Sequence, residues 1–201
     1  MRLVIVLDSV SYETFMKANC PNMKSVGIVH KALSHGSWTL PSFASMLVNI
    51  FPACTVKGCK HRELIKPDIF YTKHNRVAVL TNNPWIEMLA KGMGTHVVRV
   101  TNTFWAVVKT HDLFSNLKFD VVFIHVMETH FQKDKEWSEE IQIYWLEKVD
   151  ECLYNALNLA DEVIITADHG ENFGEGERHG MFDGIFRREV IEVPIIWSEV
   201  V

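Results

Sequence analysis

Short apolar runs bounded by turn-forming residues alternate with amphipathic stretches along this chain, and this alternation constrains the fold more than any other feature. Runs of this kind predict buried strands, and the stretches between them predict helices that cover a sheet. The predicted strands span residues 3–7, 26–29, 77–80, 97–100, 121–126, 163–166 and 193–197. The pattern therefore predicts an α/β fold, a three-layer α/β/α sandwich around a mainly parallel sheet.

Three stretches have the signals of helices. Residues 41–50 begin with proline, which is favoured in a first turn, and residues 84–91 also begin with proline. The longest predicted helix spans 137–160. Its predicted buried stripe recurs every three or four residues at Ile141, Trp145, Val149, Cys152, Ala156 and Leu159.

Length and composition indicate one globular domain over residues 1–201. Hydrophobic residues make up 48% of the chain and charged residues 22%, which excludes a disordered chain. The net charge of -5 gives no basis for a nucleic-acid-binding platform. No segment approaches the roughly 18–20 apolar residues of a membrane span, and the first residues lack the features of a secretory signal. We therefore expect a cytoplasmic protein without a membrane span.

The four cysteines are not spaced as a disulfide framework. Cys54, Cys59 and His61 have part of the spacing of a zinc clip but lack a recognisable fourth ligand. A loop with free thiols, or with a local disulfide, is the favoured interpretation, and the zinc clip remains the alternative.

Polar side chains follow several predicted strands at the point where each strand ends. Asp8 follows residues 3–7, His130 follows 121–126, and Asp168 and His169 follow 163–166. Since ligands bind at the carboxyl ends of strands in open α/β sheets, these residues are expected to meet in one crevice. The glycine-rich segment 167–180 then brings a second histidine, His179. Carboxylates with imidazoles predict a divalent metal site.

Thr39 precedes the predicted helix at 41–50 and is expected near its N-cap. A hydroxyl there lies beside unpaired backbone N–H groups and the positive end of the helix dipole, which suits a phosphoryl group. An ordinary cap is the simpler interpretation. A nearby metal would favour a nucleophile instead, because coordination lowers the pKa of a hydroxyl.

With these residues the chain resembles the sulfatase-like hydrolases of the alkaline phosphatase superfamily. The resemblance runs in order along nearly the whole chain. Its segments are Val4–Ser9, Cys20–Met23, Ser37–Ser42, Phe123–His130, Tyr144–Asp150, Ile164–Glu171, Arg178–Gly180 and Glu192–Trp197. The most specific segment is Asp168-His169-Gly170-Glu171.

The resemblance implies a set of site residues. Asp8, Thr39, Asp168 and His169 would bind a divalent metal, and Thr39 would also be the nucleophile. His130 and His179 would contact the transferring group, protonate the leaving oxygen or hold a second metal. His125 lies inside the strand that precedes His130, and we expect it to be a structural residue.

Departures from the family pattern reduce the number of reactions that the resemblance implies. Sulfatases of this family need a cysteine or serine that is converted to formylglycine, with an arginine four residues later, whereas this chain has Thr39 and Phe43. A threonine nucleophile resembles the phosphodiesterase and phospho-group-transferase branches. Most family members are also much longer, so this chain resembles a minimal core.

The sequence therefore predicts a metal-dependent hydrolase or transferase of phosphodiesters or phosphomonoesters. Its cofactor would be Mn²⁺, Zn²⁺ or Mg²⁺, as one ion or two, and its substrate a small-molecule or a lipid- or glycan-linked phosphate ester. The alternatives are an inactive module of the same fold that binds metal or phosphate and, less favoured, a sulfatase.

Overall fold

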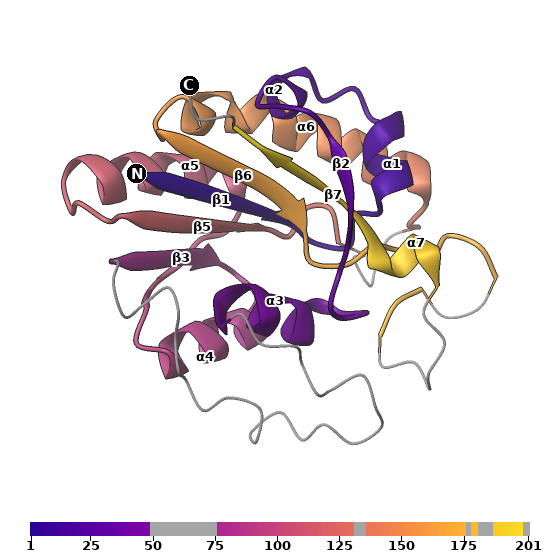
Figure 1. Cartoon of the computed structure of the whole chain (residues 1–201), viewed down its shortest axis with the longest axis horizontal. Helices are drawn as coiled ribbons and strands as arrows, with labels where there is room; N and C mark the ends of the chain where they lie inside the picture. Colours follow the sequence, from indigo (N-terminus) through magenta and orange to yellow (C-terminus); the bar gives the residue numbers. More distant parts are fainter. Residues whose placement is uncertain (49–75, 131–135, 176–177, 181–186, 199–201) are drawn as a thin grey trace.

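The computed structural model describes residues 1–48, 76–130, 136–175, 178–180 and 187–198, and these form one seven-stranded sheet flanked by helices (Figure 1). The strands are β1 (Arg2–Leu7), β2 (His30–Leu33), β3 (Val77–Thr81), β4 (His96–Arg99), β5 (Val121–Val126), β6 (Glu162–Ala167) and β7 (Glu192–Trp197). Their order across the sheet is β2-β7-β6-β1-β5-β3-β4.

The first strand is the middle strand of the sheet. β1 pairs in parallel with both β5 and β6, and β3 pairs in parallel with β5 and β4. β7 runs antiparallel to its neighbours β6 and β2. Leu7 is in register with Val126 on one side and Ala167 on the other, so the loops after β1, β5 and β6 leave the sheet side by side.

Helices cover both faces of the sheet, which confirms the predicted three-layer fold (Figure 1). One face packs against α1 (Tyr12–Lys17), α2 (Pro21–Lys24), α5 (Thr103–Ser115) and α6 (Glu139–Leu157), and the other against α3 (Thr39–Val48) and α4 (Pro84–Gly92). The short helix α7 (Arg188–Ile191) leads directly into β7. Alternate residues of β1 serve the two cores, with Leu3 and Ile5 in the first and Val4 and Val6 in the second.

The buried stripe of α6 differs from the predicted one. Val149 and Ala156 are buried as expected, but Ile141, Trp145, Cys152 and Leu159 are only partly buried. The fully buried positions are instead Gln142, Leu146, Val149, Asp150, Leu153 and Ala156. The prediction was wrong because it counted only apolar residues, whereas this face of the helix also buries two polar side chains that bind backbone groups.

Both polar side chains of α6 satisfy backbone groups of neighbouring loops. Asp150 accepts hydrogen bonds from the backbone N–H groups of Asn22 (3.1 Å) and Met23 (2.7 Å) at the start of α2. Gln142 Nε2 donates to the backbone oxygens of Ser9 (3.0 Å) and Thr129 (2.7 Å). α6 thereby connects the loops that follow β1 and β5.

Several element boundaries also differ from those predicted. The strand expected at 26–29 lies at 30–33, where it pairs with β7, and α3 begins at Thr39 itself. The helices α1, α2, α5 and α7 were not predicted. The sequence signal for α5 is Asn102, whose side chain accepts a hydrogen bond from the Trp105 N–H and caps the helix. Cys54, Cys59 and His61 lie outside the described residues, so the zinc clip stays untested, as does the single domain over 1–201.

Candidate active site

The loop after β6 holds Asp168 and His169 in a fixed arrangement. Asp168 Oδ1 accepts hydrogen bonds from the backbone N–H groups of Ser9 (3.1 Å) and His169 (2.8 Å). His169 Nδ1 lies 2.9 Å from the carbonyl oxygen of Gly170. Since a carbonyl oxygen only accepts, Nδ1 carries the proton and Nε2 presents its lone pair, which is the form of histidine that binds metals.

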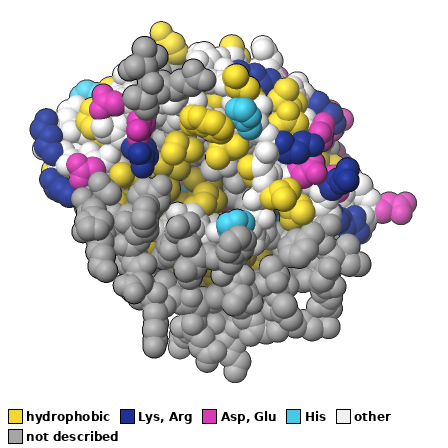
Figure 2. Space-filling view, viewed as in Figure 1, with side chains coloured by type: hydrophobic (Ala, Val, Ile, Leu, Met, Phe, Trp, Pro, Cys, Tyr) yellow, Lys and Arg dark blue, Asp and Glu magenta, His cyan; other side chains and the backbone are white. Residues whose placement is uncertain are grey.

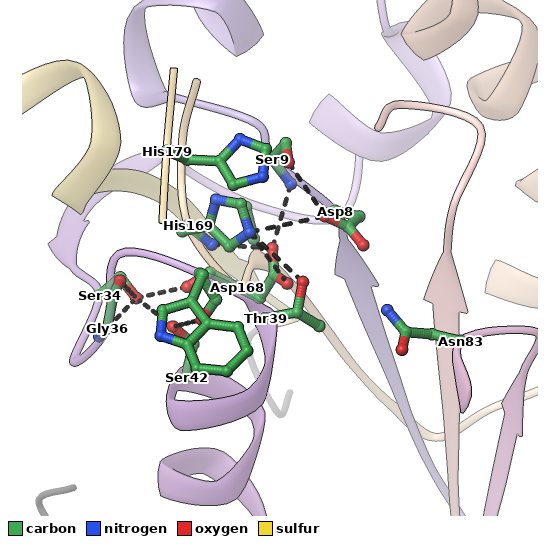
Figure 3. A network of polar contacts seen from close by, with 12 residues as sticks. Asp8, Ser9, Ser34, Gly36, Thr39, Ser42, Asn83, Asp168, His169 and His179 are labelled. Carbon is green, nitrogen blue, oxygen red and sulfur yellow. Dashed lines mark hydrogen bonds and ion pairs between the residues drawn. The ribbon is translucent and has the colours of Figure 1, made fainter. Parts of the chain in front are cut away.

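Asp8 faces the same histidine from the end of β1. His169 Nε2 lies 3.6 Å from Asp8 Oδ1 and 3.6 Å from Asp168 Oδ2, and all three side chains are buried (Figure 3). The turn after Asp8 is tight, because Ser9 has a φ of 64°. In this conformation the Ser9 hydroxyl donates to Asp8 Oδ1 (3.0 Å) while its N–H donates to Asp168.

Thr39 reaches this cluster from the other side of the crevice. Its Oγ1 lies 3.4 Å from His169 Nε2, and the residue is 7% exposed (Figure 3). Because α3 begins at Thr39, the hydroxyl lies at the positive end of that helix. The structure thus brings Asp8, Thr39, Asp168 and His169 together, as the sequence predicted.

Of the two remaining predicted histidines, His179 lies next to His169, and His130 lies next to His179. The ring centroids of His169 and His179 are 4.7 Å apart, and those of His179 and His130 are 5.2 Å apart. His179 Nδ1 lies 3.1 Å from Oε1 of Glu171, a buried carboxylate that sequence analysis did not assign to the site. The signal for Glu171 was its place in the Asp-His-Gly-Glu segment.

His125 also belongs to this cluster, although we expected it to be structural. Its Nε2 lies 3.2 Å from Asp8 Oδ2 and 4.0 Å from Asp168 Oδ2. The buried group of Asp8, His125 and Asp168 could hold a metal ion. The sequence signal was the position of His125, which is the next-to-last residue of β5. It is paired with Val6 of β1, two residues before Asp8.

Charge repulsion and burial give the site residues altered pKa values. Burial and the neighbouring Asp8 raise the pKa of Asp168 well above its usual range. Burial alone would also raise the pKa of Asp8, but contact with His125 and the charges of three histidines lower it. Burial and His179 lower the pKa of His169 to about 4, so its ring is neutral at pH 7.

A divalent cation fits these residues. Asp8 Oδ2, Asp168 Oδ2 and His125 Nε2 are buried and have no hydrogen-bond partner in the described part of the chain. Buried polar atoms normally have partners, and two carboxylates in one buried site repel each other unless a positive charge lies between them. Carboxylate and imidazole are ligands of Zn²⁺ and Mn²⁺.

Gly170 fixes the position of this loop, because a β-carbon there would lie 2.0 Å from the backbone oxygen of Glu189. Its N–H donates to the backbone oxygen of Val190 (2.7 Å). We predict that Gly170→Ala lowers the free energy of unfolding by about 3 kcal/mol or more, since backbone must move. Chemical denaturation measures this. Gly92→Ala is the matched control, because open space surrounds that position, and equal stability of the two variants would contradict the prediction.

A separate cavity of about 390 Å³ lies beside α3. Apolar side chains line most of it, among them Ala32, Met46, Phe123 and Val193. Figure 2 shows hydrophobic side chains gathered on the face of the molecule seen in this view. None of the six predicted site residues is among the described residues that line this cavity, so the titratable cluster lies outside it.

Comparisons with known proteins support the fold. No family model and no curated protein matches the sequence. Among solved structures, the C-terminal periplasmic domain of a phosphoethanolamine transferase from Campylobacter jejuni has a TM-score of 0.67 at 14% identity, over 98% of this chain and 78% of that chain. An alkaline phosphatase superfamily protein from Vibrio parahaemolyticus has a TM-score of 0.69 at 12% identity, over 98% of this chain and 60% of that chain. Phosphonoacetate hydrolase from Sinorhizobium meliloti has a TM-score of 0.53 at 16% identity, over 84% of this chain and 55% of that chain.

These similarities show that the chain has the fold of the alkaline phosphatase superfamily. In the described part of the chain, no helix combines the length and the apolar character that crossing a bilayer requires.

Proposed function

We propose that this protein is a metal-dependent phosphoesterase in which Thr39 is the nucleophile. The observation that carries the proposal is the position of the Thr39 hydroxyl, 3.4 Å from the unprotonated Nε2 of a histidine that itself lies 3.6 Å from each of two buried carboxylates. Asp8, Asp168 and His169 would bind the cation together with Thr39. The fold supports this assignment, because two structural neighbours are a phosphoethanolamine transferase and a phosphonoacetate hydrolase.

When bound, a divalent cation would supply positive charge that lowers the pKa of the Thr39 hydroxyl and neutralises a phosphoryl oxygen. Thr39 Oγ1, its proton lost to solvent, forms a bond to phosphorus as the bond to the leaving oxygen breaks. The start of α3 lies beside the equatorial oxygens and stabilises their charge. Water then attacks the phosphorus, which breaks the bond to Oγ1 and restores the Thr39 hydroxyl.

His179 or His130 provides the proton that the leaving oxygen needs. Burial lowers the pKa of His179, but the carboxylate of Glu171 outweighs this effect and raises it. His179 therefore keeps its proton to higher pH than an ordinary histidine, which suits a general acid. Glu171 also holds the ring through Nδ1, which leaves Nε2 as the nitrogen that would donate to the leaving oxygen.

The substrate in this proposal is a small-molecule or a lipid- or glycan-linked phosphate ester. A polar hollow of about 490 Å³ flanks the loop that carries His179, and its lining includes Trp137, Ser138, Asn172 and Arg178. Polar walls of this kind suit a polar leaving group. The cofactor in the proposal is one Mn²⁺, Zn²⁺ or Mg²⁺ ion, or two ions, and the cytoplasmic location remains a prediction.

Restoring metal to stripped protein tests the reaction class. We expect no hydrolysis of a chromogenic phosphodiester or phosphomonoester after chelation, and turnover when Mn²⁺ or Zn²⁺ is added, because the cation supplies the missing charge. The matched control is a chromogenic sulfate ester, which should be cleaved more slowly than either phosphate ester.

Three other outcomes would contradict the proposal. Turnover that survives chelation would exclude the metal, and preferred cleavage of the sulfate ester would indicate a sulfatase. Tight metal binding without turnover of either phosphate ester would favour the inactive binding module.

A further inference from the structure

We propose that His125 is itself a ligand of the cation, joining Asp8 and Asp168, and that it biases the site toward Zn²⁺ over Mg²⁺. This inference rests on the metal dependence in the proposed function, and it adds a ligand and a preference among metals. Resemblance to the family implied no such role for His125. Three features of the structure carry the inference: the spacing of the atoms, their lack of hydrogen bonds and the environment of the ring.

The spacing matches the coordination shell of a small cation. An ion bound at about 2.0–2.2 Å keeps neighbouring ligand atoms roughly 3–4 Å apart. His125 Nε2 lies 3.2 Å from Asp8 Oδ2 and 4.0 Å from Asp168 Oδ2. All three atoms are among the buried polar atoms that lack a hydrogen bond in the described part of the chain, and one cation would satisfy all three.

On the opposite side of the ring, Nδ1 has a partner that can accept its proton when Nε2 binds a cation. His125 Nδ1 lies 3.3 Å from Thr81 Oγ1, which already accepts a hydrogen bond from the Asn83 N–H (3.0 Å). A hydroxyl oxygen has two lone pairs, so Thr81 can also accept the Nδ1 proton of His125. Nε2 then faces the carboxylates with its lone pair, and Thr81 acts as a positioning residue.

Packing fixes the plane of the ring. The edge contact with Phe43 places the two ring centroids 5.5 Å apart at 89°. Phe43 belongs to α3, the helix that begins at Thr39, and it is fully buried. The histidine is therefore held in the core by the helix that begins at Thr39.

An imidazole ligand has a predictable effect on the choice of metal. Imidazole suits Zn²⁺, whereas Mg²⁺ prefers carboxylates and water. If His125 instead only donated a hydrogen bond to Asp8, its loss would weaken binding of both cations alike. The ratio of the two affinities therefore separates a ligand from a residue that only positions Asp8.

The test measures dissociation constants of Zn²⁺ and Mg²⁺ for the metal-stripped full chain by calorimetry, with Co²⁺ absorption as a second readout of the ligand field. We expect His125→Leu to weaken Zn²⁺ binding at least about 10-fold, and to change Mg²⁺ binding less than about twofold. Thr81→Val, which keeps the shape of the side chain, should weaken Zn²⁺ binding by about 3- to 10-fold and keep the protein folded if the leucine variant unfolds. His96→Ala is the control, because it also removes an imidazole. His96 is the first residue of β4, and its ring contacts Phe119.

Equal weakening of Zn²⁺ and Mg²⁺ binding, or Zn²⁺ binding within twofold of the wild type in both variants, would overturn the inference and leave the proposed function intact. Absence of cation binding by the wild-type protein would overturn both. An unchanged Co²⁺ spectrum in His125→Leu would also exclude His125 as a ligand.

Discussion

Thr39→Ala is expected to lower metal-dependent turnover of a phosphate ester by about 10³-fold or more, because it removes the side chain that bonds to phosphorus in the first step of the proposal. The loss should appear in kcat, since the carboxylates and histidines that bind the cation and the phosphoryl group stay in place. Steady-state kinetics with the chromogenic ester, at saturating Zn²⁺ or Mn²⁺, measures the effect.

Two variants control for this result. Thr39→Ser keeps a hydroxyl at the start of α3 and should retain part of the turnover. Thr110→Ala removes the same atoms from another buried helical position, where the hydroxyl donates to the backbone oxygen of Ala106. Turnover of Thr39→Ala equal to that of Thr110→Ala would show that another group attacks phosphorus.

Asp168→Asn is expected to act in opposite directions on metal binding and on the stability of the metal-free protein. Loss of a ligand should weaken Zn²⁺ binding at least about 100-fold. Burial and Asp8 raise the pKa of Asp168, so its protonated form is favoured by folding. Such a group contributes stability below the ordinary carboxyl pKa and loses that contribution as the pH rises through the folded-state value.

The asparagine variant should therefore be the more stable metal-free protein at about pH 8, by about 1–3 kcal/mol, with a smaller difference near pH 5. Chemical denaturation at the two pH values, with and without Zn²⁺, measures both effects. Asp150→Asn is the matched control: it alters a buried aspartate that caps α2, and should lower stability while leaving metal binding unchanged. A metal-free Asp168→Asn protein less stable than wild type at pH 8 would contradict the prediction.

The core of the site was predictable because it depends on strand order alone. Asp8 and Asp168 follow neighbouring parallel strands, so any sheet that pairs β1 with β6 brings them together. The strands other than β2 were evident from their apolar runs. The α/β/α layers followed from the alternation of these runs with amphipathic stretches.

Other features depend on tertiary contacts that a single sequence does not show. His125 looked like a core residue because its neighbours along β5 are apolar, and only the pairing of strands shows that its ring faces two carboxylates. The stripe of α6 was misplaced because Gln142 and Asp150 are polar, and their partners lie in distant loops. β2 was placed too early because its exposed residues His30 and Lys31 carry no apolar signal, and its position is set by pairing with β7.

The hydrogen bonds of Gln142 have a consequence for the thermodynamics of ligand binding. One side-chain amide connects the loops after β1 and β5, and the Thr129 hydroxyl adds a bond to the backbone oxygen of Asp8 (2.7 Å). The conformational entropy of Asp8, Ser9 and Thr129, at the starts of these loops, is thus lost when the chain folds, before any ligand arrives. Binding then needs little further ordering, so most of the attraction between ligand and protein appears as affinity.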